Sequence, residues 1–576
     1  MAKPRALSPL AFIPALALVV GLAIGLAYAT RRTLAERWLL AQLSASGLSQ
    51  ATLTVTRLDR RGIEVRDLVL GAPDAPDLVV ASVEAAWSLE GLRARRLDAV
   101  RITAPRLRGA LGDDGLALGA LNPLFAGESN ASGPPVLPAQ AFELTGGEVV
   151  LATPEGVATS TLDGQLRVSD EGTIAGAFGL RLEHPLAHAN GTVVVTGTLV
   201  QLTAELALEL RDGREPPRVA PAKLTGSVSG APSALAFDLV LQGADGRLHA
   251  EARGRADVTA RSGNADLRLA PLRFEARGLR PAELLPALEP VLAGLGIENV
   301  VGLIEAHGDL AVLEGAPKLS LDLGLRGVGF KSPFASVSGI AGTIALRAPE
   351  LRSAKGQLLS VALLDPGIAL TDGLIDFQLL ADGVLAIRST TWKWAGGELR
   401  AENLTLDLAA ERTSALLQAR DLDLAALLPL VAVEGLEGTG HIDGEVPLVR
   451  AGSELRVEKG FLRARPEGGT LRFHPSESVL AFAKSRPNDI GIAVTAFSDF
   501  HYDQLEARVD GDVRGDLRIA LHVRGANPAF QSGQPIELNL NLDARLLDLV
   551  RAGVAAYRVP AVVEERLREF SEEEKK

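Results

Sequence analysis

The sequence has no cysteine and few aromatic residues. With 0 Cys among 576 residues, disulfides, thiolate zinc sites, iron–sulfur clusters and cysteine nucleophiles are excluded. Aromatic side chains make up only 4%, which leaves few rings for stacking on bases, sugars or flavins. A basic surplus is also missing, because 59 Lys and Arg stand against 71 Asp and Glu, a net charge of −12. This charge argues against a nucleic-acid-binding protein, whose phosphate contacts need Lys and Arg.

The common sequence motifs of enzymes are absent as well. The chain contains no G-x-S-x-G, no GxxxxGK[ST] and no H-E-x-x-H pattern, and its 8 histidines are scattered. It also lacks a recognisable pair of carboxylates of the kind that glycan hydrolases use. We therefore expect that the protein is not an enzyme and that it has no catalytic residues, no metal site and no cofactor.

An uncharged segment near the N-terminus has the length of a membrane span. Residues 10–29 carry no charge, and Arg31 and Arg32 follow them directly. Twenty residues in a helix cross about 30 Å of hydrocarbon. We predict that residues 1–32 form a transmembrane anchor. A cleaved signal peptide is the alternative, because Ala27-Tyr28-Ala29 fits the small-residue cleavage pattern.

Most of the remaining chain alternates apolar and polar residues, which is typical of half-buried strands. The pattern is clear in residues 201–210, 319–326, 403–408, 517–523 and 536–543. Asp-Gly pairs, which suit tight hairpins, recur along the chain. They begin at Asp114, Asp163, Asp212, Asp245, Asp372, Asp382, Asp443 and Asp510. The alternation and the turn pairs together predict an antiparallel all-β protein.

Helical patterns are few, and they divide the chain only weakly. We predict helices in residues 33–43, 281–295, 421–431 and 544–557, followed by a charged tail. Gly and Pro cluster without periodicity in residues 130–138, which predicts a linker. The predicted organisation is an anchor (1–32), an N-terminal β region (33–129), a central β-groove (139–420) and a C-terminal β-groove region ending in a helix and tail (421–576).

Strands with one apolar face need a cover for that face. Leaving it in water is unfavourable by about 25 cal/mol per Å², and four short helices cannot cover so many strands. A stack of small sandwiches is one solution. We favour an elongated antiparallel sheet curled into a groove that holds something apolar. The residues that we predict to line this groove share one parity within their strands: Leu206, Leu208, Leu321, Leu323, Leu404, Leu406, Leu517, Ile519, Leu521, Leu538 and Leu540.

Several stretches resemble YdbH-like proteins of the AsmA-like family. Residues Leu436–Leu448 and Val457–Phe473 are similar to that family's Gly-x-Gly, Pro-Leu and Gly-Gly pattern. Residues Ala496–Asp543 are similar to its C-terminal region, notably at Phe500-His501-Tyr502. The AsmA-like family includes TamB and YhdP and resembles bridge-like lipid carriers of the chorein type. The resemblance implies a single-pass inner-membrane anchor, a periplasmic β-groove and passage of phospholipids toward the outer membrane.

Two functions follow from this resemblance. The first is a lipid bridge, in which phospholipid acyl chains lie in the groove while head groups stay in water. The second is an envelope scaffold or outer-membrane assembly factor of the TamB type without lipid conduction. The resemblance also implies a partner, a small outer-membrane lipoprotein. We expect it to dock by strand addition on the last strand, at Ile536, Leu538, Asn539, Leu540 and Asn541. The alternative is that the helix at 544–557 caps this edge.

Overall fold

The computed structural model describes most of the chain beyond its N-terminal segment. The described residues are 30–48, 50–112, 115–122, 137–198, 201–231, 233–257, 260–333, 335–348, 352–366, 368–381, 384–406, 412–431, 435–451, 454–474, 495–513 and 516–545. The predicted anchor at 10–29 lies outside them. Among the described residues, no helix is both long enough and apolar enough to span a bilayer.

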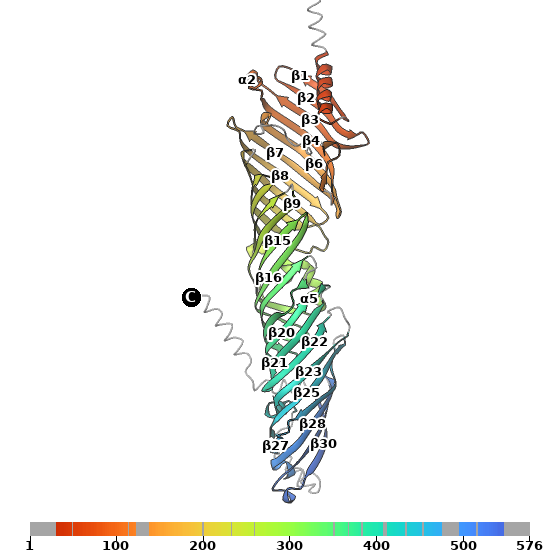
Figure 1. The fold of residues 1–576 in the computed structure, drawn as a ribbon, viewed down its shortest axis with the longest axis vertical. Helices are drawn as coiled ribbons and strands as arrows, with labels where there is room; N and C mark the ends of the chain where they lie inside the picture. Colours follow the sequence, from red (N-terminus) through yellow and green to blue (C-terminus); the bar gives the residue numbers. More distant parts are fainter. Residues whose placement is uncertain are drawn as a thin grey trace, which may run out of the picture. The chain divides into compact units, whose positions relative to one another are not determined.

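The chain forms two compact units that are built mainly of strands (Figure 1). The first unit holds β1 to β13 and most of β14. Their bounds are β1 Ala51–Leu58, β2 Gly62–Ala72, β3 Ala75–Ala86, β4 Leu97–Gly112, β5 Gly115–Ala117, β6 Ala139–Thr153, β7 Gly156–Val168, β8 Thr173–His184, β9 Ala187–Thr198, β10 Leu202–Asp212, β11 Ala222–Ala231, β12 Ala234–Gly243, β13 Leu248–Asp257 and β14 Ser262–Phe274.

The second unit holds most of β15 and β16 and all later strands. Their bounds are β15 Glu298–Leu313, β16 Ala316–Lys331, β17 Ser336–Ala348, β18 Arg352–Ser353, β19 Gln357–Asp365, β20 Leu370–Leu379, β21 Leu385–Trp394, β22 Gly397–Leu406, β23 Arg412–Asp423, β24 Leu436–Thr439, β25 His441–Ala451, β26 Glu454–Ala464, β27 Gly469–Phe473, β28 Phe500–Asp512, β29 Asp516–Ala526 and β30 Ile536–Arg545.

The helices are short, as the sequence predicts. A helix at residues 30–45 confirms the prediction for 33–43. The remaining helices are α2 Leu89–Arg93, η2 Gly119–Leu121, η3 Ala244–Gly246, α4 Pro281–Leu284, η4 Pro286–Leu288, α5 Glu289–Gly294, α6 Leu424–Leu427, η6 Leu428–Val431, η7 Phe497–Asp499 and η8 Gln531–Gly533. The prediction for 281–295 is thus confirmed, and that for 421–431 is confirmed from Leu424 onward, since residues 421–423 belong to β23. The predicted helix at 544–557 begins where β30 ends and otherwise lies outside the described residues.

In the first unit the strands pair mostly with their neighbours in sequence. Strands β6 to β14 pair one after another in antiparallel register. The exception is β4, which pairs with β6 in parallel, with Val100 opposite Phe142. A prediction of purely antiparallel pairing is therefore wrong at this junction. A tight hairpin joins only antiparallel neighbours, whereas the long connection from β4 to β6 lets the chain return before it pairs.

The second unit is an antiparallel sheet with a bend near its C-terminal end. Strands β16, β17, β19 to β23, β25, β26 and β28 to β30 pair in that order. Short strands β24 and β27 pair with each other, and β27 also pairs with the start of β28. The bend falls at Gly440, whose φ of 126° few other residues adopt. It folds β24 away from β25.

Half of the Asp-Gly pairs lie inside strands rather than in turns. Asp245 and Gly246 form the predicted turn in η3, with φ angles of 57° and 85°. The pairs that begin at Asp163, Asp372, Asp443 and Asp510 instead lie within β7, β20, β25 and β28, so the hairpin prediction is wrong there. A side chain at two of these glycines, Gly164 and Gly373, would collide with the rings of Phe178 and Trp392 from the next strand. In these two pairs the glycine makes room for a ring on the same face.

Candidate lipid-binding face

Apolar side chains form continuous rows across strands β6 to β14 of the first unit. Residues that are paired across antiparallel strands point to the same side of the sheet. One row contains Leu144, Gly164, Phe178, Val193, Leu206, Gly226, Leu239, Ala252 and Leu267. The next row contains Gly147, Leu162, Leu180, Gly191, Leu208, Leu224, Leu241, Ala250 and Leu269. We call these two rows the apolar face of the first unit. Neither row contains a charged or polar side chain.

The opposite side of the same strands is polar. The row next to that of Leu206, on its other flank from the Leu208 row, contains Glu205, Ser227, Asp238, Arg253 and Asp266, which pair across β10 to β14. The Arg253 Nε lies 3.0 Å from Asp238 Oδ2, and this carboxylate raises the pKa of the guanidinium. Charged side chains can stay in water on this side, which leaves the apolar face as the side that needs a cover.

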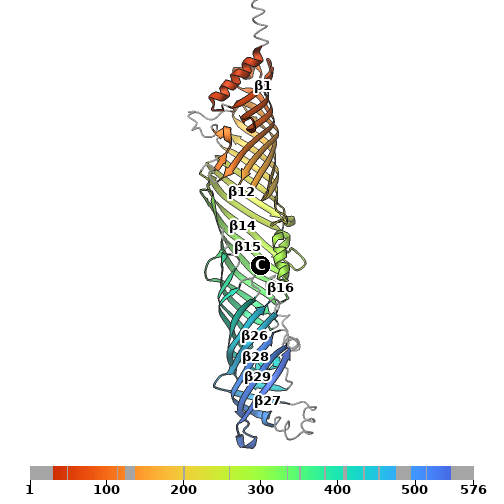
Figure 2. The ribbon, with the colours of Figure 1, turned by 90° about the vertical axis from the view of Figure 1, so that its right-hand side faces the viewer.

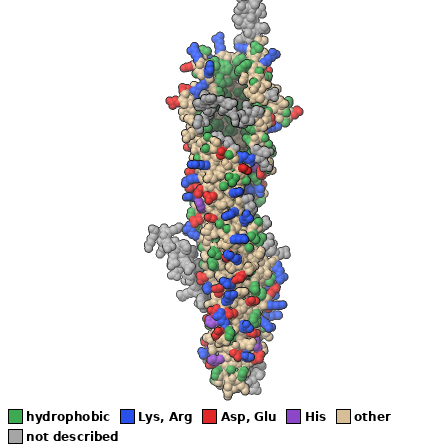
Figure 3. All heavy atoms as spheres, viewed as in Figure 1, with side chains coloured by type: hydrophobic (Ala, Val, Ile, Leu, Met, Phe, Trp, Pro, Cys, Tyr) green, Lys and Arg blue, Asp and Glu red, His purple; other side chains and the backbone are tan. Residues whose placement is uncertain are grey.

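The apolar face of the first unit is not sealed by packing. Leu206, Leu208 and nearly all their neighbours in the rows are half-buried, whereas Glu205 and Glu209 on the same strand are exposed. Among the described residues from 139 to 257, the fully buried apolar side chains are only Ala139, Val168, Ile174 and Ala189. Figure 3 shows a hollow lined by hydrophobic side chains toward the end of this unit that holds β1 to β4. The face therefore keeps free apolar surface, which is unfavourable in water.

The helix at 30–45 closes part of this end of the unit. It lies across β1 in Figure 2. Its Leu39 and Leu43 pack against Leu53 and Val55 of β1, both of which are buried. The carboxylate of Glu36 accepts a hydrogen bond of 3.4 Å from the backbone nitrogen of Val55. These contacts fix the helix on β1, which pairs with β2 on its other side.

The second unit packs a larger part of its apolar face into a core. Trp392, Leu399, Ala419, Leu462, Leu521 and Leu540 fall in one row across β21 to β30, together with Gly444 and Ala507. Near the bend, Phe500 and Val523 are 0% exposed, and Leu424 of α6 and Leu428 of η6 cover the core. This part of the face is closed by the protein's own side chains.

Two buried polar side chains hold the bend together. The Tyr502 hydroxyl donates a hydrogen bond of 2.7 Å to the carbonyl oxygen of Thr439, and burial raises the pKa of Tyr502 to about 12. Asn527, which is 1% exposed, donates through Nδ2 to the carbonyl oxygens of Thr495 and Ala496. Both contacts are structural, because they join strands and loops without a free polar atom directed at a ligand.

The geometry is that of a surface for apolar molecules, and sequence comparison identifies the protein family. A sequence model of the YdbH-like family, described as intermembrane phospholipid transport protein YdbH, matches residues 16–256 and 212–568. The chain belongs to this family. No match was found among curated proteins or among solved structures. Membership identifies the chain as one of the intermembrane phospholipid transport proteins, which act in the cell envelope, and it indicates no catalytic activity.

In this YdbH-like chain, the predicted groove residues fall in both units. Leu206 and Leu208 lie in the apolar face of the first unit. In the second unit, Leu321 and Leu323 pair with Leu346 and Ile344 and are half-buried. The half-buried residues Ile519, Leu521 and Leu538 share one side of β29 and β30 with Leu517, which is buried beside Val457 and Val513. The backbone of Leu540 is described and its side chain is not.

Strict alternation along β22 would place Leu404 and Leu406 on the side opposite to Leu399, but the alternation of burial is interrupted at Asn403. Glu402 and Asn403 are both exposed, and Asn403 has a φ of 54°. The burial pattern shifts by one residue here: Leu399 and Ala401 are buried before the interruption, and Leu404 and Leu406 are half-buried after it, while the register with β21 stays the same.

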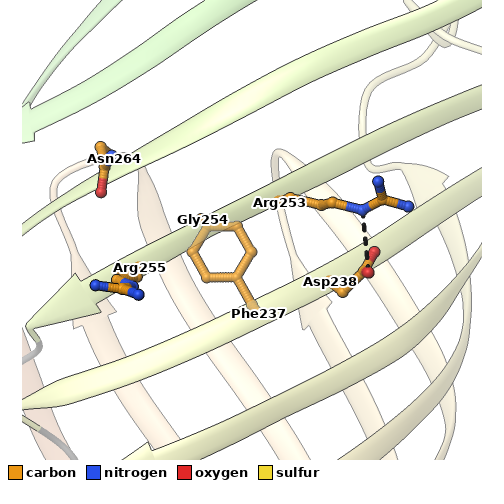
Figure 4. A pocket seen from close by; sticks show the side chains of 6 residues that line it. All are labelled: Phe237, Asp238, Arg253, Gly254, Arg255 and Asn264. Atoms are coloured by element: carbon orange, nitrogen blue, oxygen red, sulfur yellow. Dashed lines mark hydrogen bonds and ion pairs between the residues drawn. The ribbon is translucent and has the colours of Figure 1, made fainter.

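Sequence reasoning missed the rings and glycines of the apolar surface. In the first unit Phe178 lies over Gly164, and Phe237 lies over Gly254. Figure 4 shows Phe237 and Gly254 beside a hollow of about 480 Å³ that Asp238, Arg253, Arg255 and Asn264 also line. These four polar residues belong to the polar side by register, so this hollow is not part of the apolar face. That a strand glycine faces an aromatic ring can be recognised only once the strand register is known.

The predicted docking edge coincides with β30. This strand pairs with β29, and the described residues contain no second strand beside it. Asn539 Oδ1 lies 2.9 Å from His522 Nδ1 on β29, whereas Asn541 is exposed opposite Ala520. No metal-binding group of His, Asp or Glu is found among the described residues.

Proposed function

We propose that the protein is a periplasmic lipid bridge that carries phospholipids between the inner and outer membranes. The observation that carries this proposal is the half-exposed apolar face of the first unit, two rows wide and free of charged side chains. A sealed sandwich core would bury these residues. A face that stays partly open instead lets an apolar molecule bind by displacing water alone, without unpacking any side chains.

Phospholipids fit such a face because their two ends differ. Moving an acyl chain from water onto an apolar surface is favourable by about 0.8 kcal/mol of free energy for each CH₂ group that is buried. The face offers no charge or polar row that would fix a head group, so the head group stays in solvent at the edge of the sheet. Transport then requires no covalent chemistry, in agreement with the absence of catalytic motifs. An N-terminal inner-membrane anchor at residues 10–29 would hold the bridge at its membrane of origin.

The alternative is a scaffold or outer-membrane assembly factor that does not conduct lipid. The unpaired edge of β30 among the described residues favours it, because such an edge can accept a strand from another chain. The same edge also suits the bridge, since docking on a small outer-membrane lipoprotein would give the distal contact. The two functions differ in one respect, which is whether lipid touches the apolar face.

Residue-specific crosslinking tests this difference. A photoreactive phenylalanine analogue is placed at Leu208 on the apolar face, and in a second variant at Glu209, the next residue, which is exposed on the polar side. After irradiation in cells, mass spectrometry identifies lipid adducts. The bridge predicts phospholipid adducts at Leu208 and none at Glu209. Equal labelling at both positions, or none at Leu208 in folded protein, would refute lipid binding by this face.

A further inference from the structure

Two exposed apolar clusters lie at one end of the first unit. On the helix at 30–45, Leu34 and Trp38 are one turn apart and are 58% and 64% exposed. On α2, Leu89 and Leu92 are 77% and 48% exposed. Figure 1 shows the helix and α2 at the same end of the unit, near β1 to β4. Exposed apolar side chains that gather at one end of a unit leave apolar area in water, which a partner surface could cover.

The side of the helix that carries Leu34 and Trp38 is not the side that packs. Leu39 and Leu43 face β1, about 100° or more around the helix from Trp38 at 3.6 residues per turn. The helix therefore has one apolar side for the sheet and a second one for something else. Trp is the side chain most suited to the boundary between lipid and water, where its ring is apolar and its N–H remains hydrated.

Both clusters carry basic residues. Arg32 and Arg37 are exposed on the helix, and Arg93 and Arg95 are exposed at and after α2. These last two form no ion pair with any described carboxylate. The acidic groups nearby are Glu36, which binds the backbone of β1, the exposed Glu90, and Asp98, which accepts from Ser88. A surface of Leu, Trp and Arg matches an anionic bilayer, where each basic residue near the surface contributes.

We infer that this end of the first unit docks on an anionic bilayer surface through two contacts, the helix at 30–45 and α2. The position of the chain supports a bilayer as the occupant, because the uncharged residues 10–29 end directly before the helix. Docking places the hydrophobic hollow of Figure 3 at the membrane, where lipids enter. The inference deepens the proposed lipid bridge by naming the surface that receives its cargo.

The absence of cysteine makes this contact measurable in the full-length chain. Single variants Leu34→Cys and Leu89→Cys are each labelled with an environment-sensitive fluorophore and reconstituted into phosphatidylcholine vesicles that contain phosphatidylglycerol and lipids spin-labelled near the head group. Thr192→Cys, exposed on the polar side of β9, is the matched control. Both cluster probes should shift to shorter wavelength and be quenched by the spin label, and the control should do neither.

Charge removal then tests the second contact. In the Leu89→Cys background, Arg93→Gln and Arg95→Gln should each lower the docking equilibrium about fivefold on anionic vesicles and leave it unchanged on neutral ones. An unquenched Leu89 probe beside a quenched Leu34 probe would overturn two-point docking. A shift that follows protein concentration without vesicles would overturn the bilayer in favour of a second copy. Quenching reports docking whether or not Leu208 forms lipid adducts, so failure of the bridge and failure of docking are separate results.

Discussion

The difference between an open and a sealed apolar face gives a sharp prediction about buried charge. Leu208 lies half-buried on the apolar face of the first unit, whereas Leu399 is 4% exposed in the core of the second. Full burial of a leucine contributes about 1.5–3 kcal/mol. Leu208→Asp should therefore lower the free energy of unfolding by only about 1–1.5 kcal/mol, since half of that burial is lost and the carboxylate remains hydrated through the open face.

Leu399→Asp should behave differently, because no water reaches its site. Removing a buried leucine side chain costs about 2–5 kcal/mol, and an unpaired buried carboxylate adds several more. The sum of these losses is comparable with the total stability of a typical domain, about 5–15 kcal/mol. We expect Leu208→Asp to fold and Leu399→Asp to fail.

Chemical denaturation followed by circular dichroism measures both variants, with Leu208→Ala and Leu399→Ala as controls for lost apolar contact. Leu208→Asp should also lose most lipid adducts at a photoreactive residue on Leu206. If Leu208→Asp unfolds the protein as completely as Leu399→Asp does, the apolar face of the first unit is an ordinary sealed core and the bridge is wrong.

Three further predictions concern the second unit. Asp at Leu404 or Leu406 should reduce lipid adducts elsewhere in the unit while leaving most of the thermal stability, because both leucines are half-buried; unchanged adducts would indicate local binding without passage. Asn541→Pro should abolish crosslinking to an outer-membrane partner and Asn541→Ser should keep it, because proline removes a backbone donor; equal crosslinking in folded variants would exclude strand addition. Tyr502→Phe should cost about 0.5–1.5 kcal/mol in denaturant titrations by deleting the hydrogen bond to Thr439.

The Tyr502 variant also has a signature in its pH dependence. The pKa of Tyr502 is raised to about 12 in the folded protein, above the ordinary value of about 10. The folded state therefore holds the proton more tightly, and stability should fall as the pH rises from 10 to 12. Stability of Tyr502→Phe should be flatter over this interval in melts followed by circular dichroism. An identical alkaline decline in both proteins would place the sensitivity elsewhere.

The class of structure was predictable because alternation is a local property. Residues 201–210 lie in one strand, and their parity alone separates Leu206 and Leu208 from Glu205 and Glu209. Burial of every second residue follows from strand geometry, so the sequence suffices wherever a strand is regular. The short helix predicted within 421–431 was equally predictable from local sequence. At its start, the Asp423 carboxylate accepts a hydrogen bond from the backbone nitrogen of Ala425.

Non-local features were not predictable in the same way. The parallel pairing of β4 with β6 depends on where a long connection returns, which no local pattern records. The positive φ of Asn403 within β22 has no local sequence signal, and the strand glycines Gly164 and Gly373 depend on what lies on the neighbouring strand. At Asp163 and Asp372 the Asp-Gly pair lies within a strand, and its glycine makes room for a ring from the neighbouring strand. The sequence also does not show which leucines are half-buried, such as Leu208, and which are buried in a core, such as Leu399. That difference depends on core contacts, including those of α6, which only the structure shows.

The open face and the packed core answer opposite physical demands. In the proposed bridge, a face that binds many lipids in turn must avoid strong sites, and rows of Leu, Val, Ala, Gly and Phe178 without charge would provide contact of similar strength at each strand. Such a face contributes little packing to its own stability, because its side chains keep free surface. In the first unit, strand pairing in regular register therefore has to supply part of the stability. Charge pairs on the polar side, such as Arg253 with Asp238, add to it. In the second unit, Trp392 over Gly373 and Phe500 at the bend instead pack into a core of the protein's own side chains. The absence of lipid should therefore lower the stability of the first unit more than that of the second.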